Sequence, residues 1–68
     1  MRDVLERLIQ RKPFMPFTIR MNDGRGLEVS RLDDIGPLST WAVVVLSEDV
    51  FDILPYRNMS GITVREPQ

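Results

Sequence analysis

Two neighbouring side chains, Tyr56 and Arg57, are the strongest candidates for contact with a ligand. They fall in a link that follows a strand-like segment, and side chains in such links can project outward. If the chain forms a ring, one Tyr-Arg pair from each subunit would make a basic, aromatic annulus. The structural alternative is a tyrosine hydroxyl and an arginine that tie the link to the rest of the domain.

A further aromatic residue, Trp41, could stack on a nucleic-acid base, as aromatic side chains do in single-strand binding sites. Trp41 begins a continuous apolar run over 41–46, and this position favours burial in a core or in a subunit interface instead. Such a run is typical of a strand that is buried on both faces, or of one whose second face meets the helix or a neighbouring subunit.

This chain contains few side chains of the types that act in catalysis. There is no histidine and no cysteine, which removes the ordinary general base, the thiolate nucleophile, disulfides and almost every zinc site. The carboxylates of 33–34 and 48–49 occur in pairs, but we expect them to cap a turn and to stay solvated, respectively. The segment Asp23-Gly24-Arg25 is typical of a hairpin turn and not of a phosphate-binding loop. We therefore predict that the chain is not an enzyme and uses no cofactor or metal.

The charge of the chain also limits its partners. The net charge is −1 with a pI near 5.2, whereas a general nucleic-acid binder is usually basic. Seven of the nine basic residues fall in 1–31 and six of the ten acids in 32–68. The N-terminal segment is charged throughout, and no apolar stretch approaches membrane-spanning length. These features predict a cytoplasmic protein that binds neither membranes nor duplex DNA.

An amphipathic helix is predicted over about 3–12. Asp3 is a plausible N-cap, and Glu6 completes the spacing of a capping box. One apolar stripe follows, formed by Val4, Leu5, Leu8 and Ile9. Pro13 ends the helix because it disfavours helical geometry at the preceding residue. A helix this short is not stable alone, so the stripe must dock on another element.

An extended connector over 12–17 and a hairpin follow the helix. The apolar residues of the connector either pin the helix across an open barrel end or serve in recognition. Apolar residues alternate with polar ones over about 17–22, and a return strand is expected over about 25–30. Between them Asn22-Asp23-Gly24 indicates a tight turn in which Gly24 supplies a positive φ.

The remaining strands are expected over about 40–46, 50–54 and 61–65. The segment 31–39 is expected to be irregular, and 55–59 is expected to be a short link that could form one helical turn. Strands that are joined by tight turns, without crossover helices, must pair antiparallel. The sequence therefore predicts one domain over 1–68, mainly β with an N-terminal α-helix. Its five-stranded antiparallel sheet is strongly bent, as in an SH3-like (Sm-like) barrel.

Two resemblances add to this interpretation. The segment from Pro13 to Val29 fits a pattern, PFxPFxIxxxDGRxxxV, that is similar to one in short bacterial proteins to which no function is attached. Along nearly its whole length the chain also resembles the Sm-like (Hfq-like) small β-barrel family, whose elements follow the same order. Leu32-Asp33-Asp34-Ile35 resembles the turn that follows the bent second strand of that family.

The Sm-like resemblance implies a role for Tyr56, Arg57 and Asn58, which stand where that family has a tyrosine-lysine-histidine segment lining an RNA-binding pore. Arg57 keeps the positive charge, but Asn58 replaces the histidine. The first hairpin is shorter than in the family, and the Gly36-Pro37 loop is longer. Because small barrels have many unrelated roles, the fold is a firmer implication than the RNA function.

Two functions remain open from the sequence. The first is a small homo-oligomeric binding or interaction module of unknown ligand. The alternative is an Sm-like ring that binds single-stranded RNA through Tyr56, Arg57 and Asn58. In either case a small core without disulfide or metal favours self-association. In Sm-like rings strand 4 of one subunit pairs with strand 5 of the next, so the resemblance implies a contact between 50–54 of one copy and 62–65 of the next, two strands whose edges would otherwise be exposed.

Overall fold

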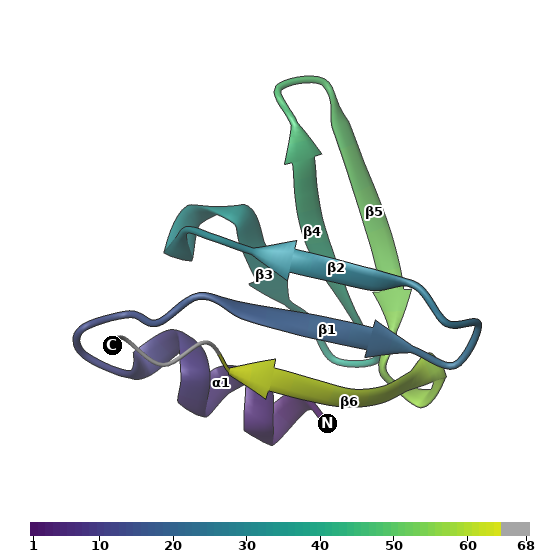
Figure 1. Ribbon diagram of the computed structural model, residues 1–68, viewed down its shortest axis with the longest axis horizontal. Helices are drawn as coiled ribbons and strands as arrows, with labels where there is room; N and C mark the ends of the chain where they lie inside the picture. The colour runs from purple at the N-terminus through teal and green to yellow at the C-terminus, as the bar shows by residue number, and fades with distance from the viewer. Residues whose placement is uncertain (65–68) are drawn as a thin grey trace.

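The computed structural model describes residues 1–64 and contains one α-helix, six strands and two short 3-10 turns (Figure 1). The elements, in chain order, are α1 (Arg2–Gln10), β1 (Phe17–Met21), β2 (Gly26–Val29), η1 (Leu32–Asp34), β3 (Ile35–Pro37), β4 (Trp41–Ser47), β5 (Val50–Pro55), η2 (Tyr56–Asn58) and β6 (Met59–Val64). The predicted class, mainly β with an N-terminal helix, is confirmed. None of the described helices is long and apolar enough to cross a membrane.

The strands form two antiparallel three-stranded sheets and not the expected single five-stranded sheet. Sheet A has the order β2-β1-β6, and sheet B has the order β3-β4-β5. In Figure 1 sheet A runs across the view, while β4 and β5 rise steeply behind it. Within residues 1–64 no strand ladder joins the two sheets into a closed barrel. The additional strand, β3, comes from the segment 31–39, which the sequence had suggested to be irregular.

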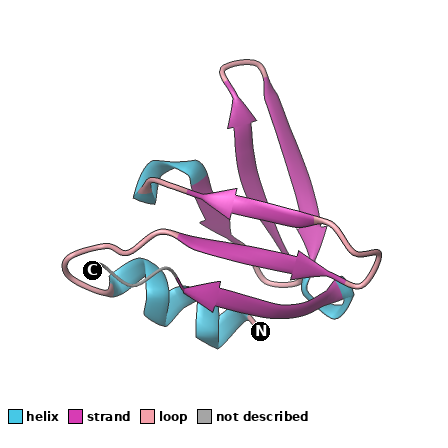
Figure 2. Cartoon of the chain, viewed as in Figure 1, coloured by secondary structure: helices cyan, strands magenta, loops and turns pink. Residues whose placement is uncertain are grey.

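Both crossings between the sheets are made by 3-10 turns, which Figure 2 shows in cyan. The chain leaves sheet A after β2 and enters sheet B through η1, and it returns from β5 to β6 through η2. The predicted helical turn before the last strand is therefore confirmed. The two crossings place η2, with Tyr56 and Arg57, at the joint between the sheets.

The hairpin between β1 and β2 has the predicted turn. The N–H of Gly24 donates to the carbonyl of Met21 at 3.0 Å, and Gly24 has a φ of 94°. Glycine adopts this left-handed geometry without the steric cost that a Cβ would add. The carboxylate of Asp23 accepts hydrogen bonds from the backbone N–H and the Nε of Arg25, at 3.0 and 2.8 Å. These bonds, the backbone one above all, lower the pKa of Asp23.

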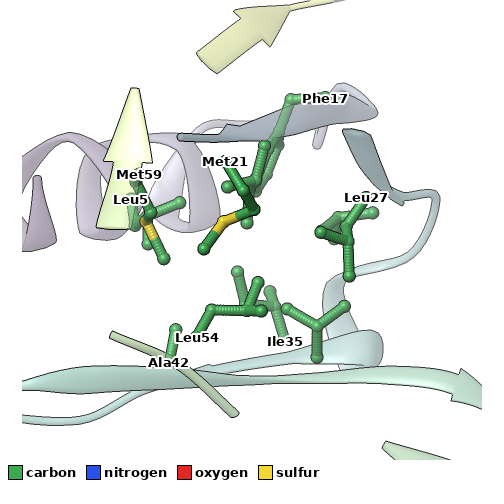
Figure 3. Packing of buried hydrophobic residues seen from close by; sticks show 11 residues of the cluster. Leu5, Phe17, Met21, Leu27, Ile35, Ala42, Leu54 and Met59 are labelled. Atoms are coloured by element: carbon green, nitrogen blue, oxygen red, sulfur yellow. The ribbon is translucent and has the colours of Figure 1, made fainter. Parts of the chain in front are cut away.

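The core lies between the facing sides of the two sheets. Phe17, Ile19 and Val29 come from sheet A, and Val44 and Leu54 come from sheet B. All five side chains are almost completely buried. Figure 3 shows the two layers facing each other, with Phe17 and Met21 on one side and Ile35 and Leu54 on the other. The alternation predicted for β1 and β2 therefore places their apolar residues in this core.

Helix α1 docks on the core through Leu5, with Leu8 and Ile9 packed beside it. The predicted N-cap is wrong, because Asp3 already lies inside the helix and Met1 takes the cap position without a side-chain bond. Glu6 does not complete a capping box; it accepts a hydrogen bond from Nε of Arg2 at 3.0 Å. The helix also ends before the expected residue 12, since the backbone is already extended at Arg11.

Candidate binding surface

Tyr56 is held in place by two hydrogen bonds to the segment between β3 and β4. Its hydroxyl donates to the carbonyl of Leu38 at 2.6 Å, and its N–H donates to the carbonyl of Thr40 at 3.2 Å. Burial raises the pKa of the Tyr56 hydroxyl, so this group stays protonated as a donor. The structural role considered for this tyrosine is therefore present, and the two bonds also fix the position of its ring.

A groove of about 480 Å³ opens beside this ring, lined by Thr40, Trp41, Pro55, Tyr56 and Arg57. The structure thus brings Tyr56 and Arg57 together with Trp41, which comes from the start of β4. Of the two burial sites expected for Trp41, the core of the domain is wrong, because Trp41 is 43% exposed in the single chain; burial in a subunit interface stays a prediction. Two aromatic rings, a proline and a guanidinium around one groove can stack on a flat apolar group and pair with an anion.

Asn58 lies apart from this groove. It lines a smaller cavity of about 150 Å³ together with residues of the β1–β2 turn, among them Asn22 and Asp23. Its carbonyl accepts a hydrogen bond from the N–H of Asn22 at 2.7 Å, and the Asn22 side chain donates to the carbonyl of Arg57 at 3.3 Å. The three residues predicted to act together are therefore split between a groove and a structural joint.

The groove lies at one end of an apolar surface that the sequence analysis did not identify as a site. In the ladder between β4 and β5, Trp41 pairs with Pro55, Val43 with Ile53, and Val45 with Phe51. Directly paired residues project from the same side of a sheet. The intervening residues Ala42, Val44 and Leu54 are fully buried, so these three pairs form the opposite, outer face of sheet B. We call these six residues the outer face of sheet B.

This outer face is left uncovered by residues 1–64. Phe51 is 62% exposed and Ile53 is 50% exposed, although both are large apolar residues in the middle of a strand. The apolar run over 41–46 is therefore buried on one face only, and neither α1 nor another described element covers the second. The one signal in the sequence was the unbroken run itself, which lacks the polar residues that a solvated face normally carries.

The charged residues next to the outer face of sheet B lie at its two ends and not among its six residues. Arg57 lies at the groove end, while Glu48 and Asp49 form the turn between β4 and β5 at the far end. None of these three makes an ion pair with another residue of the described part of the chain. On the inner side Arg25 donates to Asp52 at 3.2 Å and so links the β1–β2 turn to sheet B. The free charges thus sit at opposite ends of one apolar face.

Comparison with known proteins found no match: no family model, no curated protein and no solved structure matches this chain.

Proposed function

We propose that this chain is a small homo-oligomeric interaction module whose contact surface is sheet B and the adjoining groove. The observation that carries this proposal is the outer face of sheet B, where three consecutive cross-strand pairs are apolar and four of their six residues are exposed: Trp41, Val45, Phe51 and Ile53. Exposed apolar patches of this kind mark interaction sites on small proteins. The module binds a partner and carries out no chemical reaction of its own.

The arrangement of the elements supports an Sm-like or SH3-like origin for this module. An N-terminal helix, strands joined by short turns, and a 3-10 turn before the last strand follow the order expected for that class. Strand β1 pairs with both β2 and β6, which brings the first and the last of the described strands into one sheet. We propose that the two sheets are the halves of such a small barrel, open along their edges.

Self-association is expected to use strand edges as well as faces. Strand β5 is an edge of sheet B and β6 is an edge of sheet A. An edge strand presents unpaired N–H and C=O groups that can pair with another chain. The contact predicted between 50–54 and 62–65 of two copies would satisfy both edges at once.

Analytical ultracentrifugation and native mass spectrometry test the proposal directly. We expect an oligomer at micromolar concentration that dissociates on dilution. A chain that sediments as a monomer at high micromolar concentration would rule out the homo-oligomeric module.

A second candidate function, binding of single-stranded RNA, is favoured by one observation. The groove places Trp41 beside Tyr56 and Arg57, which provides two aromatic rings and one cation for a base and its phosphate. Stacking contributes about 1–3 kcal/mol per base in comparable sites, and the contact with phosphate weakens as salt rises. Asn58 would contribute little, because it faces the other cavity.

This candidate is tested by measuring binding of short U-rich and A-rich RNAs at low salt. Wild type should bind, Arg57→Ala should bind more weakly, and Arg11→Ala serves as the control because Arg11 is exposed and lies outside the groove. The RNA function is excluded if wild type binds neither RNA, or if Arg57→Ala binds as well as wild type does.

A further inference from the structure

The outer face of sheet B has the symmetry that a contact between two copies requires. Its central pair is Val43 and Ile53, with Trp41 and Pro55 on one side and Val45 and Phe51 on the other. A two-fold axis can pass over this central pair, in the plane of the contact and perpendicular to the strands. It places one end of the face in one copy against the opposite end of the same face in the second copy. Successive pairs are about 7 Å apart along the strands, so Phe51 of one copy would reach the Trp41–Pro55 pair of the next.

The groove at that end fits the side chain that would arrive there. Phe51 is the most exposed of the large apolar residues, and its ring has no covering element within residues 1–64. The groove beside Trp41 and Tyr56 has a volume of about 480 Å³. An apolar cavity of about 150 Å³ already holds a benzene ring, so the groove admits a phenyl group together with neighbouring atoms.

The charges at the two ends are complementary in the same arrangement. Glu48 and Asp49 lie at the turn end, and Arg57 lies at the groove end. An antiparallel pair of copies would place the acidic turn of each copy beside the arginine of the other, twice per dimer. A parallel pair would instead bring acids beside acids, which is unfavourable.

The exposed area is also of the size that a dimer needs. Trp41, Val45, Phe51 and Ile53 together expose on the order of 400 Å², taking roughly 150–250 Å² for a fully exposed aromatic side chain and the lower end of that range for the two aliphatic ones. A standard interface buries about 800 Å² per partner, of which somewhat more than half is apolar. The apolar face therefore supplies the interior of such an interface, and the charged ends supply its polar rim.

We propose that two copies of this chain pack the outer faces of their sheets B against each other in antiparallel orientation, with Phe51 of each copy in the groove of the other. This inference rests on the proposed self-association and specifies a surface that is distinct from the strand edges. The dimer would close the groove beside Trp41, so RNA binding and this dimer would exclude each other.

The single tryptophan of the chain reports on this contact. As the wild-type concentration rises, Trp41 emission should shift to the blue and acrylamide quenching should fall, in parallel with the dimer measured by sedimentation. Phe51→Ser should weaken the dimer about tenfold or more, as loss of an aromatic side chain seated in a pocket of the partner does. Val50→Ser is the matched control: Val50 is the neighbouring residue, is 51% exposed and lies on the opposite side of β5.

Charge exchange tests the antiparallel orientation. Arg57→Glu and Asp49→Arg should each weaken the dimer about threefold to fivefold at low salt, and the double variant should recover most of the loss. Asp49 is preferred to Glu48 because Glu48 also lines a hollow with Arg31. Arg11→Glu is the control for a change of net charge.

The outcomes separate the two proposals. If wild type self-associates but Trp41 emission stays constant, or if Phe51→Ser associates like wild type, the face-to-face dimer is wrong, and self-association by the strand edges is the part of the proposed function that remains. If the double charge variant is weaker than both single variants, the antiparallel orientation is wrong. If wild type is monomeric at high micromolar concentration, the proposed function and this inference both fail.

Discussion

The outer faces of the two sheets are built from the same kind of strands but have opposite character. On sheet A the outward residues of β1 and β2 are Thr18, Arg20, Gly26 and Glu28. Arg20 donates from its Nε to the hydroxyl of Thr63 on β6 at 3.2 Å. On sheet B the corresponding positions of β4 and β5 hold only apolar residues. The core takes one apolar face from each sheet, so within residues 1–64 it does not use the second apolar face of sheet B.

The largest difference in unfolding free energy is expected between substitutions of two phenylalanines that lie on different faces of the sheets. Phe17 belongs to the inner face of sheet A and is 1% exposed (Figure 3). Phe51 belongs to the outer face of sheet B and is 62% exposed. Phe17→Ala should lower the free energy of unfolding by about 3–5 kcal/mol, because it removes buried surface and leaves a cavity. A loss this large is most of the stability of a small domain.

Phe51→Ala should change the unfolding free energy of the dilute monomer by about 0.5 kcal/mol or less. Urea denaturation at low protein concentration, followed by circular dichroism, measures both variants. Comparable losses for the two phenylalanines would show that the outer face of sheet B is part of the folding core, and the contrast between the sheets would disappear.

A smaller effect is expected at Tyr56, which links the return from sheet B to the segment after β3. Tyr56→Phe should cost about 1 kcal/mol, since it leaves the carbonyl of Leu38 without this donor. The pKa of the tyrosine is raised in the folded chain, so the unfolded chain loses its proton first, near pH ~10. Stability from this group is thus complete below that pH and falls as pH rises further.

Chemical denaturation between neutral and strongly alkaline pH checks this prediction. The part of the alkaline loss that belongs to Tyr56 should be absent in Tyr56→Phe. The chain has one tyrosine, so its tyrosinate absorbance follows the same ionisation directly. An unaltered alkaline loss in the phenylalanine variant would assign that loss to another group.

The smallest effect should come from the ion pair that joins the two sheets. Arg25 of the β1–β2 turn contacts Asp52 of β5 at 3.2 Å, and the Arg25 side chain is more than half exposed. A double-mutant cycle with Arg25→Gln and Asp52→Asn should give a coupling of about 0.5 kcal/mol, which salt reduces. A coupling above about 2 kcal/mol would mean that polar contacts, and not the shared core, hold the sheets together.

The elements that the sequence predicted well are those whose signals are local. The alternation in 17–22 and the Asp23-Gly24 turn depend on neighbouring residues, and the hairpin was placed to within a residue or two at each end. The cap at Asp3 was wrong because the helix begins one residue earlier, at Arg2, so that Asp3 lies in its first turn, where an acidic side chain is also favourable. Strand β3 was missed because its three residues include a glycine and a proline and are ordered by pairing with β4.

The site was harder to predict because its parts come together only through tertiary structure. Tyr56 and Arg57 were identified from their position before the last strand, and they do line the groove. Trp41 was expected in a core or in a subunit interface, and the structure excludes only the core. The apolar run could not decide between the two, because it carries no information about whether one face of the strand or both are covered within the chain. The separation of Asn58 follows from its carbonyl contact with Asn22, a residue 36 positions earlier in the chain.

The pairing of β1 with β6 sets an order for folding during synthesis. Phe17 lies opposite Val64 in that ladder, so β1 leaves the ribosome long before its second partner exists. The strands of sheet B, in contrast, are contiguous in the chain and can pair as soon as Pro55 has emerged. Local pairings form faster than distant ones. A nascent chain that ends at Pro55 therefore holds the β1–β2 hairpin and sheet B but lacks β6, so the edge of β1 that β6 will cover is still unpaired and open to other strands.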